Sequence, residues 1–204
     1  VVARASEELS WIPARAGDPL LDGDSLFTGS SSDAEVSFLI GDVEVQVGSD
    51  SLVVVLAEDG KALLDLKQGG VSSRMGSSGG ALKLRSQGRE TEVSGKGSKV
   101  GYTVGADGKA EVAVFSGQVE VKSEGKSAVV KENQSVAIAS DGALAEVQSY
   151  SVEALAPLQG ARVWTKPRVK SVQFAWKRPS DAKGSVWVEV ANDEAMSHVI
   201  ARKK

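Results

Sequence analysis

The sequence predicts an all-β protein built from about a dozen short strands. Apolar and polar residues alternate with a period of two over most of the first 150 residues, and the alternating runs recur about every 8 to 12 residues. Turns containing glycine separate the runs, and 20 of the 22 glycines precede Leu155. A helical interpretation of any large segment would contradict both the period of two and the spacing of the glycines.

The first predicted strands lie within the N-terminal fifty residues. Short strands at 10–16 and 26–27 flank a turn at Gly17-Asp18-Pro19. Residues 36–47 then alternate on both sides of Gly41-Asp42, which predicts a hairpin with one face exposed to water.

The middle of the chain adds strands of a different kind. Residues 52–56 are apolar without alternation, which is typical of a strand covered on both faces. The loop 76–80 has the sequence Gly-Ser-Ser-Gly-Gly, and we expect it to be the most mobile loop of this region because it offers almost no side chain to pack. Separate strands are expected at 64–66, from Val71 onward, at 82–84 and at 90–93.

The stretch Gly101 to Lys122 has the most regular pattern. Its three apolar runs are separated by Asp107-Gly108 and Ser116-Gly117, and both dipeptides supply the positive φ that tight turns require. The stretch therefore predicts three consecutive antiparallel strands. Two further strands are expected at 128–130 and 136–138.

The charge distribution indicates two domains. Up to Ala154 the chain has 14 Lys and Arg against 23 Asp and Glu, whereas from Leu155 onward it has 10 against 4. We expect an all-β domain over residues 1–150 and a second module over residues 151–204. The Ser-x-Glu start at Ser151 is similar to a partial N-cap and predicts a short linker helix there.

The second module alternates again at 172–176 and 186–190. This pattern resembles the first strands of an immunoglobulin or fibronectin type III sandwich. Such a domain needs about 100 residues, so the segment is expected to form a partial Ig-like β-sandwich.

The composition excludes several classes of site. The chain has no cysteine, which removes disulfides, cysteine-ligated metals and thiol nucleophiles. Its longest apolar run, 52–57, is far shorter than the roughly 20 residues of a membrane helix. The chain begins at Val1-Val2, and we expect it to be a segment of a longer protein whose targeting sequence lies outside it.

Five short motifs follow one another between Leu20 and Ile138: Gly23–Gly29, Ala34–Val47, Leu64–Val71, Val104–Val121 and Val129–Val136. In this order they resemble the motifs of the FecR domain family. The chain departs from the family pattern at Asn133-Gln134, where the family has Gly-Gln, and at 97–102, which replaces a more compact motif.

The resemblance implies a β-solenoid-like or rolled antiparallel domain in the periplasm or cell envelope of a bacterium. Some members of the family relay signals to anti-sigma machinery, and others are parts of multidomain envelope proteins that also contain Ig-like repeats. The Ig-like tail favours the second group. We therefore expect a non-enzymatic binding or scaffolding module that contacts a protein partner or a cell-wall glycan such as peptidoglycan.

Two alternatives remain open. One is a periplasmic signal-relay domain that contacts its partner by strand addition, and the other is a glycan-active enzyme on a β-scaffold. We expect no cofactor and no nucleic-acid partner, and we expect membrane contact only through segments outside this chain.

The candidate binding residues lie in the second module. Residues 162–178 contain six basic residues, no acidic residue and three aromatic residues, a composition that can bind an anionic glycan or nucleic acid. Phe174 and Trp176 share the face of Val172, however, which favours a core position for them and solvation for the basic side chains. Trp187 points away from the apolar face of its strand and could stack on a sugar ring or lie in an interface. The candidates are Trp187, Arg162, Lys166, Arg168 and Lys170.

Catalytic and metal sites have little support. Asp18, Asp22 and Asp24 lie close together, but their spacing lacks the alternating ligands of an EF-hand, so a solvated turn is favoured over a Ca²⁺ site. His198 is the only histidine, which argues against a transition-metal site. No serine lies in a nucleophile-elbow sequence, and we predict no catalytic residue and no metal ligand.

Overall fold

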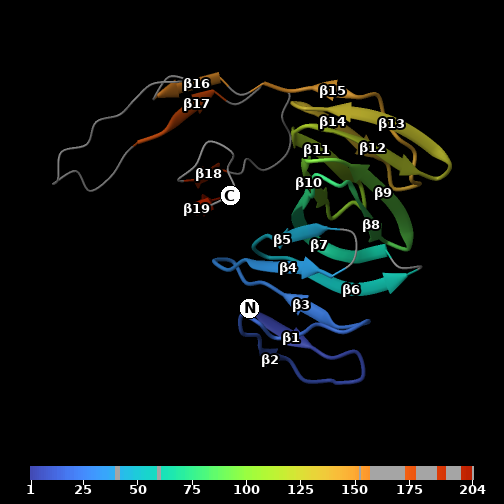
Figure 1. The fold of residues 1–204 in the computed structure, drawn as a ribbon, viewed down its shortest axis with the longest axis vertical. Helices are drawn as coiled ribbons and strands as arrows, with labels where there is room; N and C mark the ends of the chain where they lie inside the picture. The colour runs from blue at the N-terminus through green and yellow to red at the C-terminus, as the bar shows by residue number, and fades with distance from the viewer. Residues whose placement is uncertain are drawn as a thin grey trace. The chain divides into compact units, whose positions relative to one another are not determined.

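The structure is a computed structural model that describes residues 1–39, 42–58, 61–151, 153–156, 173–177, 188–191 and 199–203. The chain divides into two compact units, Val1–Tyr150 and Ser151–Lys204, called here the first and the second unit. The all-β prediction is confirmed, because every element in the described ranges is a strand (Figure 1). Among those residues, accordingly, no helix could cross a membrane.

The first unit contains fifteen strands that form one continuous, open hydrogen-bonded network. Their bounds are β1 Val2–Arg4, β2 Ile12–Pro13, β3 Ser25–Phe27, β4 Ala34–Phe38, β5 Val43–Val47, β6 Leu52–Glu58, β7 Lys61–Met75, β8 Gly80–Ser86, β9 Arg89–Gly95, β10 Lys99–Val104, β11 Ala110–Ser116, β12 Gln118–Ser123, β13 Lys126–Lys131, β14 Gln134–Ile138 and β15 Gln148–Ser149.

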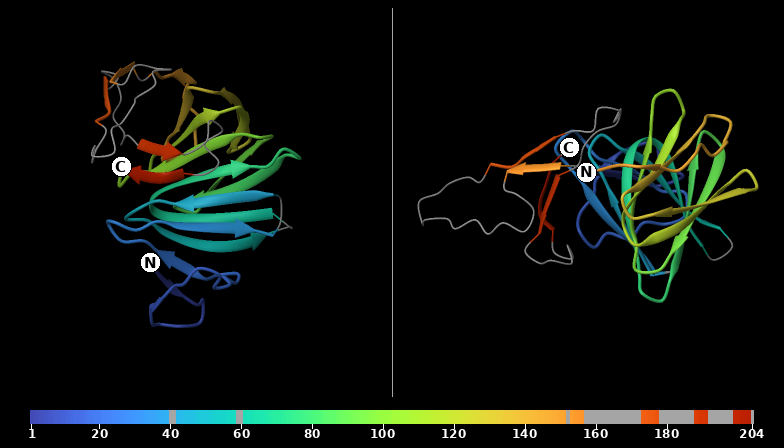
Figure 2. Two further views of the ribbon diagram at one scale, coloured as in Figure 1. Left: turned by 60° about the vertical axis from the view of Figure 1, so that its left-hand side comes forward. Right: turned by 90° about the horizontal axis from the view of Figure 1, so that it is seen from above.

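Strand β7 joins two layers of this network. Its first part pairs with β6 and β8, and its second part pairs with β5 and β10. Layer A has the order β2-β1-β3-β6-β7-β8-β9-β12-β13, and layer B has the order β4-β5-β7-β10-β11-β14-β15. All pairs are antiparallel except β7 with β8, which is parallel. Figures 1 and 2 show the strands stacked from β1 and β2 at one end to β13 and β15 at the other.

The passage of β7 between the layers corrects the prediction of separate strands at 64–66 and from Val71. A single strand of 15 residues runs through Gly69-Gly70 without interruption. Gly69 has φ +91°, and a Cβ at this position would lie 2.7 Å from the Cα of Ser51. The glycine pair therefore redirects a strand where the sequence pattern indicates a strand end.

The core lies between the two layers and follows the period of two. Layer A contributes Leu64, Leu82 and Val93, for example, and layer B contributes Val45 and Val112, all fully buried. Residues on the outer faces alternate with them and are mostly polar or charged. The prediction that residues 52–56 are covered on both faces is only partly met. Val53 and Val55 are buried, but Leu52, Val54 and Leu56 on the other face are only half-buried.

The stretch Gly101 to Lys122 forms three strands, but they are not three neighbours. β10 pairs with β11 as predicted. β12 instead pairs with β9 and β13 in layer A. The turn at Ser116-Gly117 is therefore a crossing between the layers, and it lets both flanking strands bury their valines in the same core. The positive φ predicted for Gly108 and Gly117 is present, at +76° and +79°.

The second unit is described in four strands: β16 Glu153–Ala156 pairs with β17 Ala175–Lys177, and β18 Val188–Ala191 pairs with β19 Val199–Lys203. The predicted linker helix is wrong, because Glu153 and Ala154 pair with Lys177 and Trp176 in an antiparallel ladder. One isolated N-cap signal over a few residues cannot offset the cost of helix nucleation when a partner strand is available.

The aromatic residues of β17 also differ from the expectation. Phe174 is 51% exposed and Trp176 is 38% exposed, although their spacing favoured a core position. The described part of the second unit consists of two two-stranded pairs. The partial Ig-like sandwich remains a prediction.

Candidate functional site

The predicted binding residues cannot be placed. Trp187, Arg162, Lys166, Arg168 and Lys170 all lie outside the described residues, as does His198. A candidate site must therefore be sought on the first unit, where the loops and surfaces are described almost completely.

The three aspartates of the turn at 18–24 have structural roles. Asp18 accepts a hydrogen bond from Arg15 N, and Asp22 accepts one from Ala57 N, both at 2.8 Å. Asp24 accepts two, from Ser6 N at 3.1 Å and from Leu21 N at 2.8 Å. These carboxylates cap separate backbone groups and do not converge. In the part of the chain that the structure describes, no three His, Cys, Asp or Glu side chains form a group that could hold a metal ion.

The first family-like motif, Gly23–Gly29, also has a structural role. Gly23 has φ +86° and donates its N–H to the carbonyl oxygen of Val55 at 2.8 Å. Thr28 is fully buried, and its hydroxyl donates to the carbonyl oxygen of Gly48 at 2.5 Å. This motif therefore fixes β3 against its neighbours.

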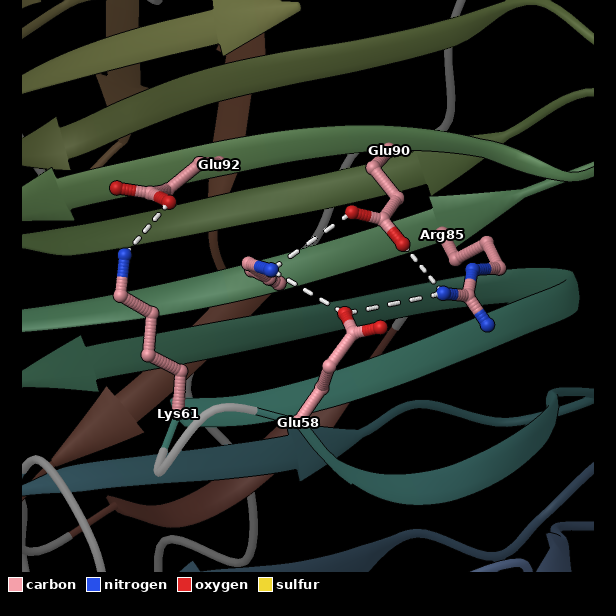
Figure 3. A network of polar contacts seen from close by, with 6 residues as sticks. Glu58, Lys61, Arg85, Glu90 and Glu92 are labelled. Atoms are coloured by element: carbon pink, nitrogen blue, oxygen red, sulfur yellow. Dashed lines mark hydrogen bonds and ion pairs between the residues drawn. The ribbon is translucent and has the colours of Figure 1, made fainter.

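A network of ion pairs covers part of the outer face of layer A (Figure 3). Lys61 pairs with Glu92 at 3.0 Å across β7 and β9. Lys83 contacts both Glu58, at 3.2 Å, and Glu90, at 3.8 Å. The guanidinium of Arg85 pairs with Glu90 and lies 4.0 Å from Glu58. Three cations thus alternate with three carboxylates over strands β6 to β9.

The charges of this network satisfy one another. The hydrogen bond between Arg85 and Glu90 raises the pKa of the arginine and lowers the pKa of the carboxyl group. Leu63 lies on the same outer face, in register with Leu56 and Lys83, and is nevertheless fully buried. We attribute its burial to the long aliphatic stems of the charged side chains. The network covers an apolar residue, and each of its six charged groups has an ion-pair partner.

Next to the network lies a shallow groove of about 420 Å³ across β8, β9, β12 and β13. Gly95 is one of the residues that line it, and a Cβ there would approach Ser98 Oγ to 2.6 Å and Gln118 O to 2.8 Å. The one acidic side chain of its lining, Glu120, pairs with Lys122 at 3.2 Å. The exposed surface of the groove is largely apolar, and Lys96 is the one basic side chain of its lining. It is lined by Gly79, Gly80, Ser94, Gly95, Lys96, Gln118, Val119, Glu120 and Val129.

Besides the groove, the surface of the first unit includes the edge strands of the two layers. Three of the four edge strands have protective features: β2 has two residues and includes Pro13, β15 has two residues, and β13 begins and ends with lysine. The fourth, β4, has five regular residues without proline or lysine, and it pairs only with β5 among the described strands. Leu39, directly after β4, is fully exposed.

Sequence reasoning missed both features because each depends on pairing between distant segments. The groove is formed by residues from 79 to 129, and no local motif connects them. The status of β4 as an edge strand depends on which strands fail to pair with it. The low content of Lys and Pro in Ala34–Phe38 is the one sequence signal that could have indicated an exposed edge.

No protein-family model and no curated protein matches the chain. Two crystal structures, at 1.65 and 2.50 Å resolution, of a "putative anti-sigma factor" from Parabacteroides distasonis ATCC 8503 are similar in fold. Each matches with a TM-score of 0.47 and 15% sequence identity over 61% of this chain. The chain spans 59% of the length of those solved chains.

Proposed function

We propose that this chain is a non-enzymatic binding module of the bacterial cell envelope that contacts a protein partner. The observation that supports a protein partner is the edge of β4, a regular strand that pairs only with β5 among the described strands and is followed by the exposed Leu39. Open edges of this kind are the sites at which sheets accept an added strand.

The polar groups of the first unit support a binding role over a catalytic one. The aspartates at 18–24 cap backbone N–H groups, and the charged residues of the outer face of layer A neutralise one another. Thr28 and Ser51 bond to backbone atoms. These groups are therefore already engaged in holding the fold. A turnover assay on cell-wall glycans should detect no product, and measurable hydrolysis or elimination would overturn this part of the proposal.

The envelope location rests on the resemblance of the ordered motifs to the FecR domain family. Cell fractionation with an antibody against the chain tests it. We expect the protein in the periplasmic or envelope fraction, and its recovery in the cytoplasmic fraction would contradict the assignment.

The binding role is tested with the full 204-residue chain immobilised on a resin. One arm uses detergent-solubilised envelope proteins, followed by identification and measurement of the purified binder, and the other uses isolated peptidoglycan. Saturable binding to a purified envelope protein supports the proposal. Retention of peptidoglycan alone would replace the protein partner with a wall glycan, and retention of neither would overturn the binding role.

A signal-relay domain is the second candidate function. The same β4 edge favours it, because addition of a strand is a reversible way to couple two proteins. A partner that binds only in one of its own states, such as a receptor with and without its ligand, would distinguish relay from constitutive scaffolding.

A further inference from the structure

We propose that the free edge of β4 is the binding site, and that it accepts an extended segment of a partner protein whose inward side chains are apolar and whose outward side chains include a basic residue opposite Glu35. This inference rests on the proposed function and adds to it the site and the chemistry of the partner. Three observations lead to it: the unequal layers, the pattern of β4 and the charge beside it.

The two layers have different lengths at this end of the first unit. Beyond β7, layer A continues through β6, β3, β1 and β2, whereas layer B continues only through β5 and β4. Strands β1 and β2 therefore have no counterpart in layer B among the described strands. Figures 1 and 2 show them at the end of the stack nearest the N-terminus.

An apolar side chain is left exposed where the counterpart strand would lie. Ile12 is in register with Ala3, and Ala3 is in register with Leu26, which is buried in the core. The three residues therefore face the same side of layer A. Ile12 is nevertheless 62% exposed. Counted from β7, a strand added to β4 would lie opposite β1, next to the strand that carries Ile12.

The side chains of β4 alternate between the core and solvent, as in a strand that has neighbours on both sides. Val36 faces the core in register with Val45, and Ala34 and Phe38 pack against the same core. Glu35 and Ser37 point to the opposite, exposed face. A segment with apolar residues at every second position would continue the core on one face and contact Glu35 on the other.

The charge on this edge selects the partner. Glu35 is exposed and lies in register with Gln46, whose amide donates to the carboxylate of Asp33. The first unit as a whole contains 22 acidic and 14 basic residues. A basic residue directly opposite Glu35 is therefore favoured, and a second copy of the same acidic unit is disfavoured.

The test uses the full chain and the acetylated, amidated peptide Thr-Val-Lys-Val-Thr-Val, with binding followed by changes in the amide NMR signals of 34–38 and of Ile12. We expect saturable binding centred on β4. Glu35→Lys should weaken binding of this peptide by about tenfold. A peptide with Glu in place of its Lys should bind the Glu35→Lys variant about tenfold more tightly than the original peptide does. Glu111→Lys, the same charge change on an exposed position of β11 in the same layer, should leave binding unchanged.

Two further variants separate side-chain from backbone effects. Ile12→Ser should weaken peptide binding by several-fold. The far-UV spectrum and unfolding midpoint of this variant should stay close to those of the parent chain, because the side chain of Ile12 is exposed. Ser37→Lys should weaken the binding of both peptides, because lysine on an edge strand opposes strand addition.

The outcomes are distinguishable from those of the proposed function. Signal changes centred on β13 or β15, or a charge swap without effect, would overturn the β4 assignment even if the chain still binds an envelope protein. Sedimentation velocity could instead show a dimer that is lost in the Glu35→Lys variant. This result would mean that a second copy of the chain occupies the edge, and it would overturn the proposal of a partner segment with a basic residue. Loss of binding to both peptide and envelope proteins would overturn the site and the proposed function together.

Discussion

Thr28, directly after β3, and Ser51, directly before β6, form a corner held by a reciprocal pair of hydrogen bonds. Ser51 N donates to Thr28 Oγ1 at 3.0 Å, and Thr28 N donates to the carbonyl oxygen of Ser51, also at 3.0 Å. The hydroxyl of Ser51 in turn accepts a hydrogen bond from Gly70 N at 3.1 Å. The pair thereby ties β3 and β6 to the point where β7 passes between the layers.

The first prediction concerns this pair. Thr28→Val should lower the free energy of unfolding by about 2 kcal/mol, because the buried N–H of Ser51 and the carbonyl oxygen of Gly48 each lose a partner. Urea unfolding measures the effect. Thr103→Val, at an exposed position of β10, is the matched control and should change stability by less than about 0.5 kcal/mol. Equal losses in the free energy of unfolding for the two substitutions would show that the hydrogen bonds of Thr28 do not stabilise the fold.

The second prediction concerns Gly69. An alanine there would place its Cβ 2.7 Å from the Cα of Ser51 and would have to adopt φ +91°. We expect Gly69→Ala to cost about 2–4 kcal/mol, the combined effect of a backbone clash and a left-handed conformation. Gly88→Ala isolates the conformational part, because Gly88 has φ +81° with no atom within 4 Å of a Cβ, and it should cost about 1–2 kcal/mol. A smaller loss for Gly69→Ala than for Gly88→Ala would refute the account of the β7 bend.

The third prediction concerns acid stability. The hydrogen bond from Arg85 lowers the pKa of Glu90 below its ordinary value of 4.5. Because the folded pKa is the lower one, this group stabilises the fold above pH 4.5, and the contribution is lost as the pH falls through the folded pKa. Glu90→Gln should flatten the decline of stability in this acidic range. The effect is small, about 0.5 kcal/mol, because both partners are partly exposed, and it should shrink further in 1 M salt. Glu124→Gln, an exposed turn residue for which no ion pair is described, is the control.

The fourth prediction concerns the two tyrosines. Burial raises the pKa of Tyr102 to about 12, and burial also raises the pKa of Tyr150 to about 12. Their neutral forms stabilise the fold fully below pH 10, and this contribution is lost as the pH rises from 10 through about 12. Ultraviolet titration should show almost no tyrosinate at pH 10.5 in the native protein and substantial ionisation in urea. Identical titration curves in the two states would contradict the buried positions.

The sequence predicts some levels of this fold and not others. The strands from Val36 to Val47 and from Tyr102 to Val114 are evident because alternation and turn chemistry agree over short distances. Asn133 has φ +60°, a left-handed conformation that asparagine tolerates better than most residues other than glycine.

The arrangement of the strands depends on long-range choices that no local pattern encodes. Ser116-Gly117 could close a hairpin or cross between layers, and only the partners available to β12 decide between them. Gly69-Gly70 could likewise end a strand or bend it. β4 can be identified as an edge strand only when the order of the strands in layer B is known.

The central claim is that β4 is an open edge that receives a partner strand, and backbone amide hydrogen exchange tests it most directly. In the free chain we expect the amides of 34–38 that point away from β5 to exchange far faster than those of the central strand β11, 110–116. Saturating partner or peptide should slow exchange at 34–38 by at least about tenfold while β13 and β15 keep their free rates. Unchanged exchange at 34–38 under saturation, or protection at another edge, would contradict the claim.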